Sequence, residues 1–520
     1  MNPSRCEFQS DAVNREARRQ RLSLWRCLGP IAAALAGLAA LRPAPAAAQI
    51  LGANYNETSR YVDEAQLALS KTKWVRGFFD ILQMQDVGNL ATNDNIVGLR
   101  RAQAAGQQVI FSFKWAFENH NQNVPTPGSP QEAALFARAV ETLEAVGAPI
   151  NHIVLGNEPM WETRQADLQR PAPGEAPAVV TFTERLLDYV QQHYGALQTQ
   201  RPQYYVGSLN RLYDAGPQGS AVVQEFFQLA RDNPLVAGVD LHVHYDTLQE
   251  AQEMMQFARS TLGAGKDLLA TEFSPVWRYQ NALDEPIGAD PAGAQFAQQY
   301  GYEPSLLVQD YLHDAFASQV SRQEWTDFIV SQPWFNEHHI RNMHALFRQH
   351  GVSVATLGYN QTEAMRGLDP TRSGYAPFQI NWLFIEGLVE ESEPLDASNE
   401  PYMADWLDAQ HLLADVDRDS DIDLSDWQLM LPNLMRDLAA EQIPPEQWLA
   451  AGDLNKSGQV DRTDFRIFKD AYVSRYGPAA FDAQFAVPEP TSLALVPPAA
   501  ATAWLLQRML ANERAARPSR

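Results

Sequence analysis

Short apolar runs of strand length alternate along the chain with segments that have the spacing of amphipathic helices. Gly, Pro, Asn or charged residues bound these runs, as is usual for buried parallel strands. The runs predict strands at residues 50–54, 73–80, 108–115, 153–155, 204–210, 237–245, 266–272 and 352–359. Helical spacing is clearest at 60–71, 93–106, 130–147 and 181–194, with a closing helix expected near 378–388. This alternation over about 340 residues predicts an α/β fold of the (β/α)₈, or TIM-barrel, type at residues 49–390.

Two of the predicted strands end in glutamate. The fourth runs into Asn157-Glu158-Pro159, and the seventh ends at Glu272, 114 residues later. The carboxyl ends of barrel strands form the face on which barrel enzymes build their active sites. Glycoside cleavage needs two carboxyls, one to protonate the leaving oxygen and one to attack or to activate water. Taken alone, Glu158 fits equally well the first turn of a helix, where the helix dipole favours a carboxylate.

Asn157-Glu158-Pro159 resembles the Asn-Glu-Pro signature of the clan A retaining glycoside hydrolases, and residues 266–275 resemble the seventh strand of that clan. The resemblance implies that Glu158 is the acid/base, Glu272 the nucleophile and Asn157 a ligand of the sugar 2-hydroxyl. It also implies an arginine near the nucleophile, for which Arg76 is the candidate; pairing with a structural carboxylate is the alternative. The sequence context is nearest to the β-xylosidase/iduronidase and glucuronidase-like families of the clan.

The expected charges follow from this arrangement. The charge of Glu272 should raise the pKa of Glu158, whereas Arg76 should keep Glu272 ionised. The sixth strand places His242 and His244 on one face, followed by Tyr245. The clan pattern there is His-x-Tyr, which implies that His244 and Tyr245 hydrogen-bond to the substrate or the nucleophile. A His-x-His pair also suits a metal, but the sequence shows no matching third ligand nearby.

Aromatic residues at strand ends and in loops are candidate platforms for a sugar ring, with core packing as the alternative. The candidates are Trp115, Trp161, Trp277 and Tyr359. The connection between the seventh and eighth strands, about 275–350, is aromatic and long for a barrel loop. Such a connection indicates an elaboration over the site.

Two Asp-rich loops, 38 residues apart, follow the barrel. Side-chain oxygens at loop positions 1, 3, 5, 7, 9 and 12 can wrap one Ca²⁺. The predicted ligands are Asp415, Asp417, Asp419, Asp421, Asp423 and Asp426 in the first loop, and Asp453, Asn455, Ser457, Gln459, Asp461 and Asp464 in the second. The loops resemble dockerin type I repeats, although Ser420 replaces the glycine that the second loop has at Gly458. The resemblance implies an all-α calcium module at 405–478 and a cohesin-like protein partner.

Both ends of the chain have the character of sorting signals. Residues 1–48 combine arginines, a short apolar run and three alanines, which is typical of an export signal, and they contain both cysteines, Cys6 and Cys27. Residues 487–520 resemble the PEP C-terminal sorting signal of bacteria. The acidic segment 391–404 is predicted to be a linker. We therefore expect an exported protein, at the cell surface or outside the cell, that meets a membrane only through its terminal signals.

The net charge is −23, and the body between residues 49 and 490 carries about −30. Such a charge excludes nucleic acid as a partner and suits a protein that holds divalent cations. The most specific hypothesis is an exported, retaining glycoside hydrolase that needs no catalytic cofactor and holds Ca²⁺ in its second module. The alternatives are a non-catalytic surface protein that binds polysaccharide or a scaffold, and a calcium module attached to a silent barrel.

Overall fold

A computed structural model describes residues 50–360, 380–389, 397–410, 414–417, 422–444, 447–454 and 457–485. The chain divides into a unit that ends at His411 and a second unit that begins at Leu412. The predicted signals at 1–48 and 487–520 lie outside the described residues. In the part of the chain that is described, no helix has the length and apolar character needed to cross a membrane.

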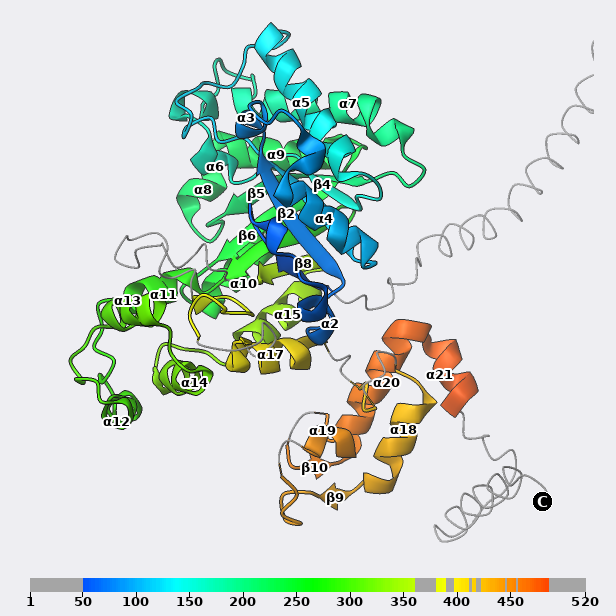
Figure 1. Cartoon of the computed structure of the whole chain (residues 1–520). Coiled ribbons are helices and arrows are strands. Elements are labelled where there is room, and N and C mark those ends of the chain that lie inside the picture. The colour runs from blue at the N-terminus through cyan, green and yellow to red at the C-terminus, as the bar shows by residue number, and fades with distance from the viewer. Residues whose placement is uncertain are drawn as a thin grey trace, which may run out of the picture. The chain divides into compact units, whose positions relative to one another are not determined.

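The first unit is a closed barrel of eight parallel strands, as predicted (Figure 1). Pairing of β1 with both β2 and β8 closes the barrel. The strands are buried almost throughout, which explains their near-continuous apolar sequences. They are β1 (Leu51–Asn54), β2 (Trp74–Asp80), β3 (Gln108–Lys114), β4 (His152–Val154), β5 (Gln203–Asn210), β6 (Val236–His244), β7 (Asp267–Ser274) and β8 (Val352–Gly358).

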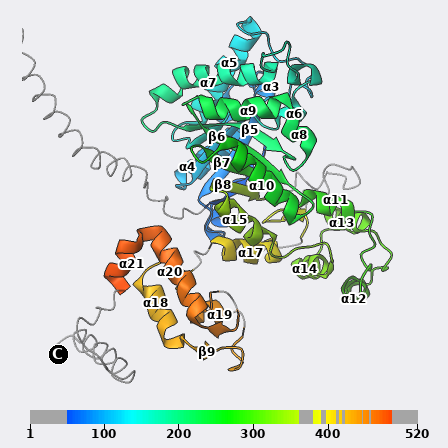
Figure 2. The same ribbon diagram turned by 180° about the vertical axis from the view of Figure 1, so that it is seen from behind.

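Helices surround the strands, as the views from the two sides show (Figures 1 and 2). They include α2 (Glu64–Leu69), α4 (Asp94–Ala104), α5 (Pro130–Val146), α7 (Ala178–His193), α9 (Ala221–Asp232), α10 (Leu248–Leu262) and α15 (His339–Gln349). Local sequence sets their starts. The Ser129 side chain caps α5, with Pro130 as its first residue, and Thr247 and Glu250 form a capping box at α10.

The long connection after β7 folds into four helices before α15: α11 (Val276–Ala282), α12 (Pro291–Tyr300), α13 (Val308–Ser318) and α14 (Arg322–Ser331). Most of its aromatic side chains pack against one another. Phe296, Tyr311 and Phe328 are buried, and the rings of Tyr311 and Phe328 lie 4.0 Å apart between centroids. These rings extend the hydrophobic core of the barrel unit, so few of them are free to contact a ligand.

Of the closing helix expected near 378–388, the described residues show only Ile380 as helical. Residues 381–389 make turns and isolated bridges instead. The backbone N–H groups of Phe384 and Ile385 donate to carbonyls of other segments, those of Tyr359 and Ala397, both at 2.8 Å. They are therefore not available for helical hydrogen bonds. The next helix is α17 (Glu400–Gln410).

Helix α17 corrects the predicted boundary between the modules. It spans the end of the predicted linker and the start of the predicted calcium module, yet it packs on the barrel. The Trp406 indole donates to the carbonyl of Ser70 at 3.0 Å, and the Asp405 carboxylate accepts from the backbone N–H of Ile340 at 2.7 Å. The buried face of α17, which includes Tyr402 and Trp406, explains why this segment cannot be a linker.

The second unit contains α18 (Leu424–Met430), α19 (Trp448–Ala451), α20 (Arg462–Tyr476) and α21 (Pro478–Phe485). A two-stranded antiparallel sheet of β9 (Arg436–Asp437) and β10 (Gln459–Val460) makes it not purely helical, contrary to expectation. A helix follows each Asp-rich loop. Asp423 and Asp461 start α18 and α20 with capping boxes.

Close strand packing requires Gly238, which lies on β6 where a Cβ atom would stand 2.0 Å from the backbone oxygen of Asp267 on β7. We expect Gly238→Ala to destabilise the barrel by about 1–3 kcal/mol, because two backbones must separate. Exposed Gly265 has open space around its Cβ position, so Gly265→Ala serves as the control. Urea unfolding measures both variants, and equal stabilities would contradict the packing argument.

Candidate active site

Glu158 stands just beyond the carboxyl end of β4, at the start of α6 (Pro159–Glu162). Its backbone is left-handed, with φ 36° and ψ 57°, a conformation that disfavours non-glycine residues by about 1–2 kcal/mol. The side chain is 28% exposed and accepts a hydrogen bond from the Asn210 amide at 2.8 Å. The turn therefore holds a carboxylate at the mouth of the barrel, reachable from solvent.

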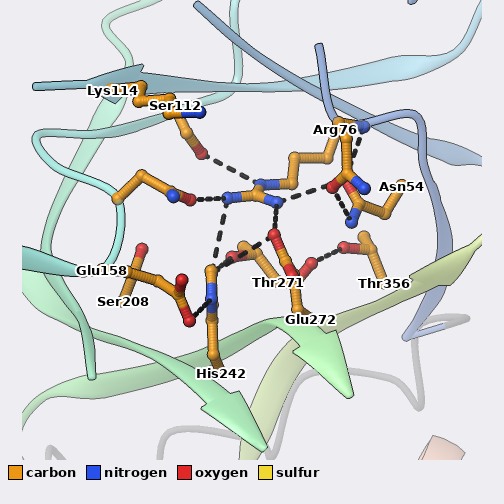
Figure 3. Close-up of polar contacts among 12 residues, drawn as sticks. Asn54, Arg76, Ser112, Lys114, Glu158, Ser208, His242, Thr271, Glu272 and Thr356 are labelled. Atoms are coloured by element: carbon orange, nitrogen blue, oxygen red, sulfur yellow. Dashed lines mark hydrogen bonds and ion pairs between the residues drawn. The ribbon is translucent and has the colours of Figure 1, made fainter. Parts of the chain in front are cut away.

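Glu272 lies on β7, and Arg76 and His242 contact it (Figure 3). Its Oε1 accepts from Arg76 Nη1 at 2.6 Å and lies 3.7 Å from His242 Nε2, while its Oε2 lies 3.6 Å from His244 Nε2. Burial raises the pKa of Glu272, but the charges of His242 and Arg76 and the hydrogen bond of His244 outweigh it and hold the pKa far below its usual range. Glu272 is ionised, as expected.

His242 bridges the two glutamates. It is fully buried on β6, and its Nδ1–H donates to Glu158 Oε1 at 3.2 Å, on the opposite side of the ring from Glu272. Burial lowers the pKa of His242, but the charge of Glu272 and the hydrogen bond to Glu158 raise it above its usual value. The imidazolium form is therefore favoured between two carboxylates.

The pKa of Glu158 differs from expectation. Burial and the charge of Glu272 raise it, but the hydrogen bond and the charge of His242 outweigh both and lower it. The prediction from the sequence rested on Glu272 alone and omitted the cation between the two carboxylates. In the substrate-free protein, the opposite shifts of the two pKa values thus favour a proton on His242 over one on Glu158.

Arg76 is buried completely and held on several sides. Its Nε donates to Ser112 Oγ at 3.1 Å, Nη1 also reaches Asn54 Oδ1 at 3.2 Å, and Nη2 donates to Asn157 Oδ1 at 2.8 Å. Figure 3 shows the guanidinium at the centre of this network, with Ser112, Asn54 and Glu272 around it. Arg76 thus lies where the resemblance implied, against Glu272.

Both polar atoms of the Asn157 side-chain amide are hydrogen-bonded to other residues of the site. Its Oδ1 accepts from Arg76, and its Nδ2 donates to Glu162 Oε1 at 2.8 Å. Glu162 is 7% exposed, and its burial raises the pKa to about 8, against the lowering effect of the hydrogen bond from Asn157. The site therefore contains a third carboxyl that is neutral at pH 7.

The structure places only some of the predicted aromatic residues at the site. Trp161 is 55% exposed beside Glu158, and its indole donates to Asn210 Oδ1 at 3.1 Å. Trp277 is half-buried, with the Arg211 guanidinium 5.7 Å from its ring. These two remain candidate platforms.

The other aromatic candidates belong to the core. Trp115 packs edge-on against Phe182 and donates to the carbonyl of Leu155 at 2.9 Å. The Tyr359 hydroxyl bonds to Ser70 Oγ at 2.6 Å, and the Tyr245 hydroxyl bonds to His339 Nδ1 at 3.3 Å. All three are at most 5% exposed and do not contact the two glutamates; large aromatic side chains are the most effective groups for filling such interiors.

His242 and His244 acquire a third potential metal ligand in the folded chain. Donor atoms of these residues and Glu158 lie within 4.8 Å of one another. Arg76 opposes a cation there, because its Nη2 lies 3.5 Å from His242 Nε2 and would repel a divalent ion. His244 also keeps Nδ1 on Ser274 Oγ at 2.8 Å. The arrangement favours an ion-pair network over a metal site.

A cavity of about 620 Å³ opens beside the ends of β6 and β7. Tyr245 and Pro275, which directly follow His244 and Ser274 in the chain, form part of its wall. The insert supplies most of the rest, including Arg278, Val330, Phe335, Asn336, Glu337, His338 and His339. This volume lies in the range of small-ligand sites.

Sequence reasoning missed three contacts: His242 as the bridge, Asn210 as a partner of Glu158, and Glu162. Asn210 ends the fifth strand, so its position on the active face was available as a signal. Glu162 follows Glu158 by one helical turn, but nothing in the sequence shows that it is buried.

No protein-family model matches the chain, and no curated protein matches it either. Among solved structures, a psychrophilic glycoside hydrolase family 10 endo-β-1,4-xylanase matches 67% of this chain and 95% of its own, at 12% identity and a TM-score of 0.37. A glycoside hydrolase family 30 subfamily 8 xylanase from Clostridium acetobutylicum matches 45% of this chain at 16% identity and a TM-score of 0.28, and this chain spans 59% of that enzyme.

A monomeric dihydrodipicolinate synthase variant also matches, over 58% of this chain and 97% of its own, at 8% identity and a TM-score of 0.25. Similarities this distant carry no argument about chemistry, because one barrel fold serves many reactions. The reaction has to be argued from the site.

The raised pKa of Glu162 predicts how the stability of the folded protein changes with pH. An unfolded Glu titrates near about 4.3, so the folded state retains a proton that the unfolded state loses between about 4.3 and 8. The contribution of this group to stability is therefore complete below about pH 4.3 and is lost as the pH rises through 8. The amide introduced by Glu162→Gln does not titrate, so the melting temperature of this variant relative to wild type should rise from pH 5 to pH 8.

The control is Glu118→Gln, whose carboxyl is 55% exposed. Thermal unfolding at several pH values should show a flat difference for this variant. A flat difference for Glu162→Gln as well would contradict the assignment of Glu162 as a neutral buried acid.

Proposed function

We propose that the barrel is a glycoside hydrolase that acts by a retaining, double-displacement mechanism, with Glu272 as nucleophile and Glu158 as acid/base. The observation that carries the proposal is the pair of strand-end carboxylates joined by one imidazolium, His242. Such a pair supplies the two groups that the reaction needs, and the cations around Glu272 keep it ionised for attack.

In the first step, a Glu272 oxygen forms a bond to the anomeric carbon while the bond to the leaving oxygen breaks. Glu158 delivers a proton to that oxygen. In the second step, Glu158 removes a proton from water, the hydroxide forms the new bond to the anomeric carbon, and Glu272 departs as a carboxylate. Glu272 ends the cycle ionised, as it began, and Glu158 returns the proton taken from water to His242, from which its acid proton came.

His242 reconciles the low pKa of Glu158 with its role as an acid. A substrate over the barrel mouth would cover the exposed part of Glu158 and disfavour its charge. The proton held at His242 Nδ1, 3.2 Å from Glu158 Oε1, is then the one that moves to the carboxylate. Trp161 is the exposed ring best placed beside Glu158 to stack on a sugar.

The alternative is a barrel that binds polysaccharide without cleaving it. It would use the same exposed Trp161 and the cavity behind Tyr245, but it would not need the ion-pair network. A buried network of charges is a poor source of stability, since hydrophobic groups of similar size often replace it without loss. Carboxyls with strongly shifted pKa values in such a network favour the catalytic proposal over the alternative of binding alone.

Glu272→Ala should reduce turnover of every glycoside by at least about a thousandfold, because no nucleophile remains. Glu158→Ala should spare the first step only for aryl glycosides with good leaving groups, since these need no proton. Azide should then restore turnover of Glu158→Ala and yield a β-glycosyl azide from a β-linked substrate. Glu118→Ala, which removes an exposed carboxyl, is the control.

A panel of aryl glycosides and of plant and algal polysaccharides supplies the substrates. Product anomers, followed by NMR, should retain the configuration of the substrate. Near-wild-type activity of Glu272→Ala would contradict the role of that residue, and inverted products would contradict the retaining mechanism. Binding without turnover by the wild type would favour the alternative.

The second unit is proposed as a dockerin-like calcium module, with a cohesin-like protein as its partner. Asp415, Asp417 and Asp426 offer oxygens within 4.8 Å of one another. Asp426 Oδ1 accepts from the backbone N–H of Asp417 at 3.2 Å, and Asp464 Oδ1 accepts from that of Leu454 at 2.8 Å, so position 12 closes each loop. Burial raises the pKa of Asp426 to about 6. A bound cation would lower this pKa again.

Three of the predicted calcium ligands, Asp419, Asp421 and Asn455, lie outside the described residues. Export and the two sorting signals are part of the same proposal: the protein acts at or beyond the cell surface. The catalytic barrel itself is proposed to need no cofactor.

Calcium should stabilise the second unit by about 2.7 kcal/mol at a hundredfold excess over its dissociation constant. In calorimetry of the full chain, one unfolding transition should move with Ca²⁺ and with chelator, whereas the barrel transition and glycoside turnover should not. Asp464→Ala should remove much of this response, and Glu441→Gln, an exposed change outside the loops, should keep it. If no unfolding transition moved with Ca²⁺, the result would contradict the proposal of a calcium module.

A further inference from the structure

Glu162 is fixed to the same turn as Glu158 although it is remote from solvent. Its backbone N–H donates to the carbonyl of Glu158 at 3.0 Å, and its own carbonyl accepts from the N–H of Glu118 at 2.8 Å. Its carboxyl lies between the Asn157 amide and the backbone N–H of Trp115, at 2.8 and 3.4 Å. The mechanism above gives this buried acid no role.

The Asn157 amide connects Glu162 to the cation at the centre of the site. Its nitrogen donates to Glu162 Oε1, and its oxygen accepts from Arg76 Nη2 at 2.8 Å. Rotation of the amide by half a turn would bring its NH₂ group against the guanidinium, two donors facing each other. An acceptor at position 162 therefore selects the orientation in which the amide supports Arg76.

Arg76 carries the connection to Glu272. Its Nη1 donates to Glu272 Oε1 at 2.6 Å, in a charge-assisted bond. The path from Glu162 to the proposed nucleophile thus runs through two side chains and three hydrogen bonds. The two side chains between its ends, Asn157 and Arg76, are at most 5% exposed. Fixed side chains of this kind hold a reacting group within the narrow range that catalysis requires.

We propose that Glu162 is a positioning residue that, through Asn157 and Arg76, holds Glu272 in place for attack on the anomeric carbon. The inference rests on the proposed glycosidase function and adds to it a residue that touches no substrate. Its neutral state at pH 7 suits the role, because a second buried negative charge near Glu158 would oppose the ionisation of that carboxyl.

The kinetic test compares Glu162→Gln with Glu162→Ala on an aryl glycoside. Gln keeps an acceptor for the Asn157 amide, whereas Ala removes it. Glu162→Ala should lower kcat by at least about tenfold with little change in KM. The acidic limb of the pH profile of kcat/KM should also move to higher pH, because a less firmly held Arg76 stabilises the charge of Glu272 less. Glu162→Gln should stay within about threefold of wild type at pH 7.

A purely structural role would lower the amount of folded enzyme without moving the acidic limb. An unmoved limb in Glu162→Ala, or an equal loss of activity in Glu162→Gln and Glu162→Ala, would overturn the proposal.

A second test needs no activity. Urea midpoints of Glu162→Ala, Glu272→Gln and the double variant form a cycle between two groups that share no direct hydrogen bond. The shifts should be non-additive, because removal of either end weakens the hold on Arg76. The control cycle pairs Glu162→Ala with Asp267→Asn, at the opposite end of β7, and should be additive.

The two tests separate the proposals. A wild type without glycosidase activity would refute the proposed function, yet a non-additive Glu162–Glu272 cycle would still establish the connection. An additive cycle would overturn the positioning role even in an active enzyme.

Discussion

The ion pair between Arg76 and Glu272 is the interaction on which the rest of the site depends. A guanidinium with no exposed surface is tolerated only when its donors are satisfied, and Asn54, Ser112 and Asn157 satisfy them together with Glu272. Loss of one partner from such a pair costs about 3–5 kcal/mol, because it leaves a buried charge alone. The neighbouring residues are therefore constrained by the arginine as much as by any substrate.

Strand register explains why these residues meet. Asn210 on β5 pairs with His242 on β6, and His242 pairs with Glu272 on β7, so the three lie in one row across adjacent strands. On the other side of the barrel, Asn54 on β1 pairs with Arg76 on β2 in the same way. In a closed barrel, such rows face one another across the interior. A register slip of one residue would turn these side chains away from the interior.

The sequence predicted the elements well and the contacts less well. Hydrophobic periodicity located the eight strands because buried parallel strands are apolar on both faces. Glu158 and Glu272 were found because strand ends can be read from the pattern, whereas Arg76, inside β2, was a candidate only through the resemblance to clan A. Trp115 and Tyr359 were assigned to the site from their positions alone, although their burial depends on neighbouring helices that the pattern cannot place. The extra helix α17 was missed because its apolar residues follow an acidic stretch.

Three glutamates of the same chemistry reach different charge states in this site. Burial raises the pKa of all three, and the partners of Glu158 and Glu272 reverse that effect. Glu158 and Glu272 each contact a cation and are held ionised, whereas Glu162 bonds to a neutral amide and remains protonated. In the substrate-free site, the pKa shifts therefore favour protons on His242 and Glu162. Of these two, only His242 has a proton within hydrogen-bonding distance of Glu158, at 3.2 Å. The proposed acid chemistry of Glu158 thus begins with the imidazolium, and this ties the proposed proton donor to the same histidine that contacts the proposed nucleophile.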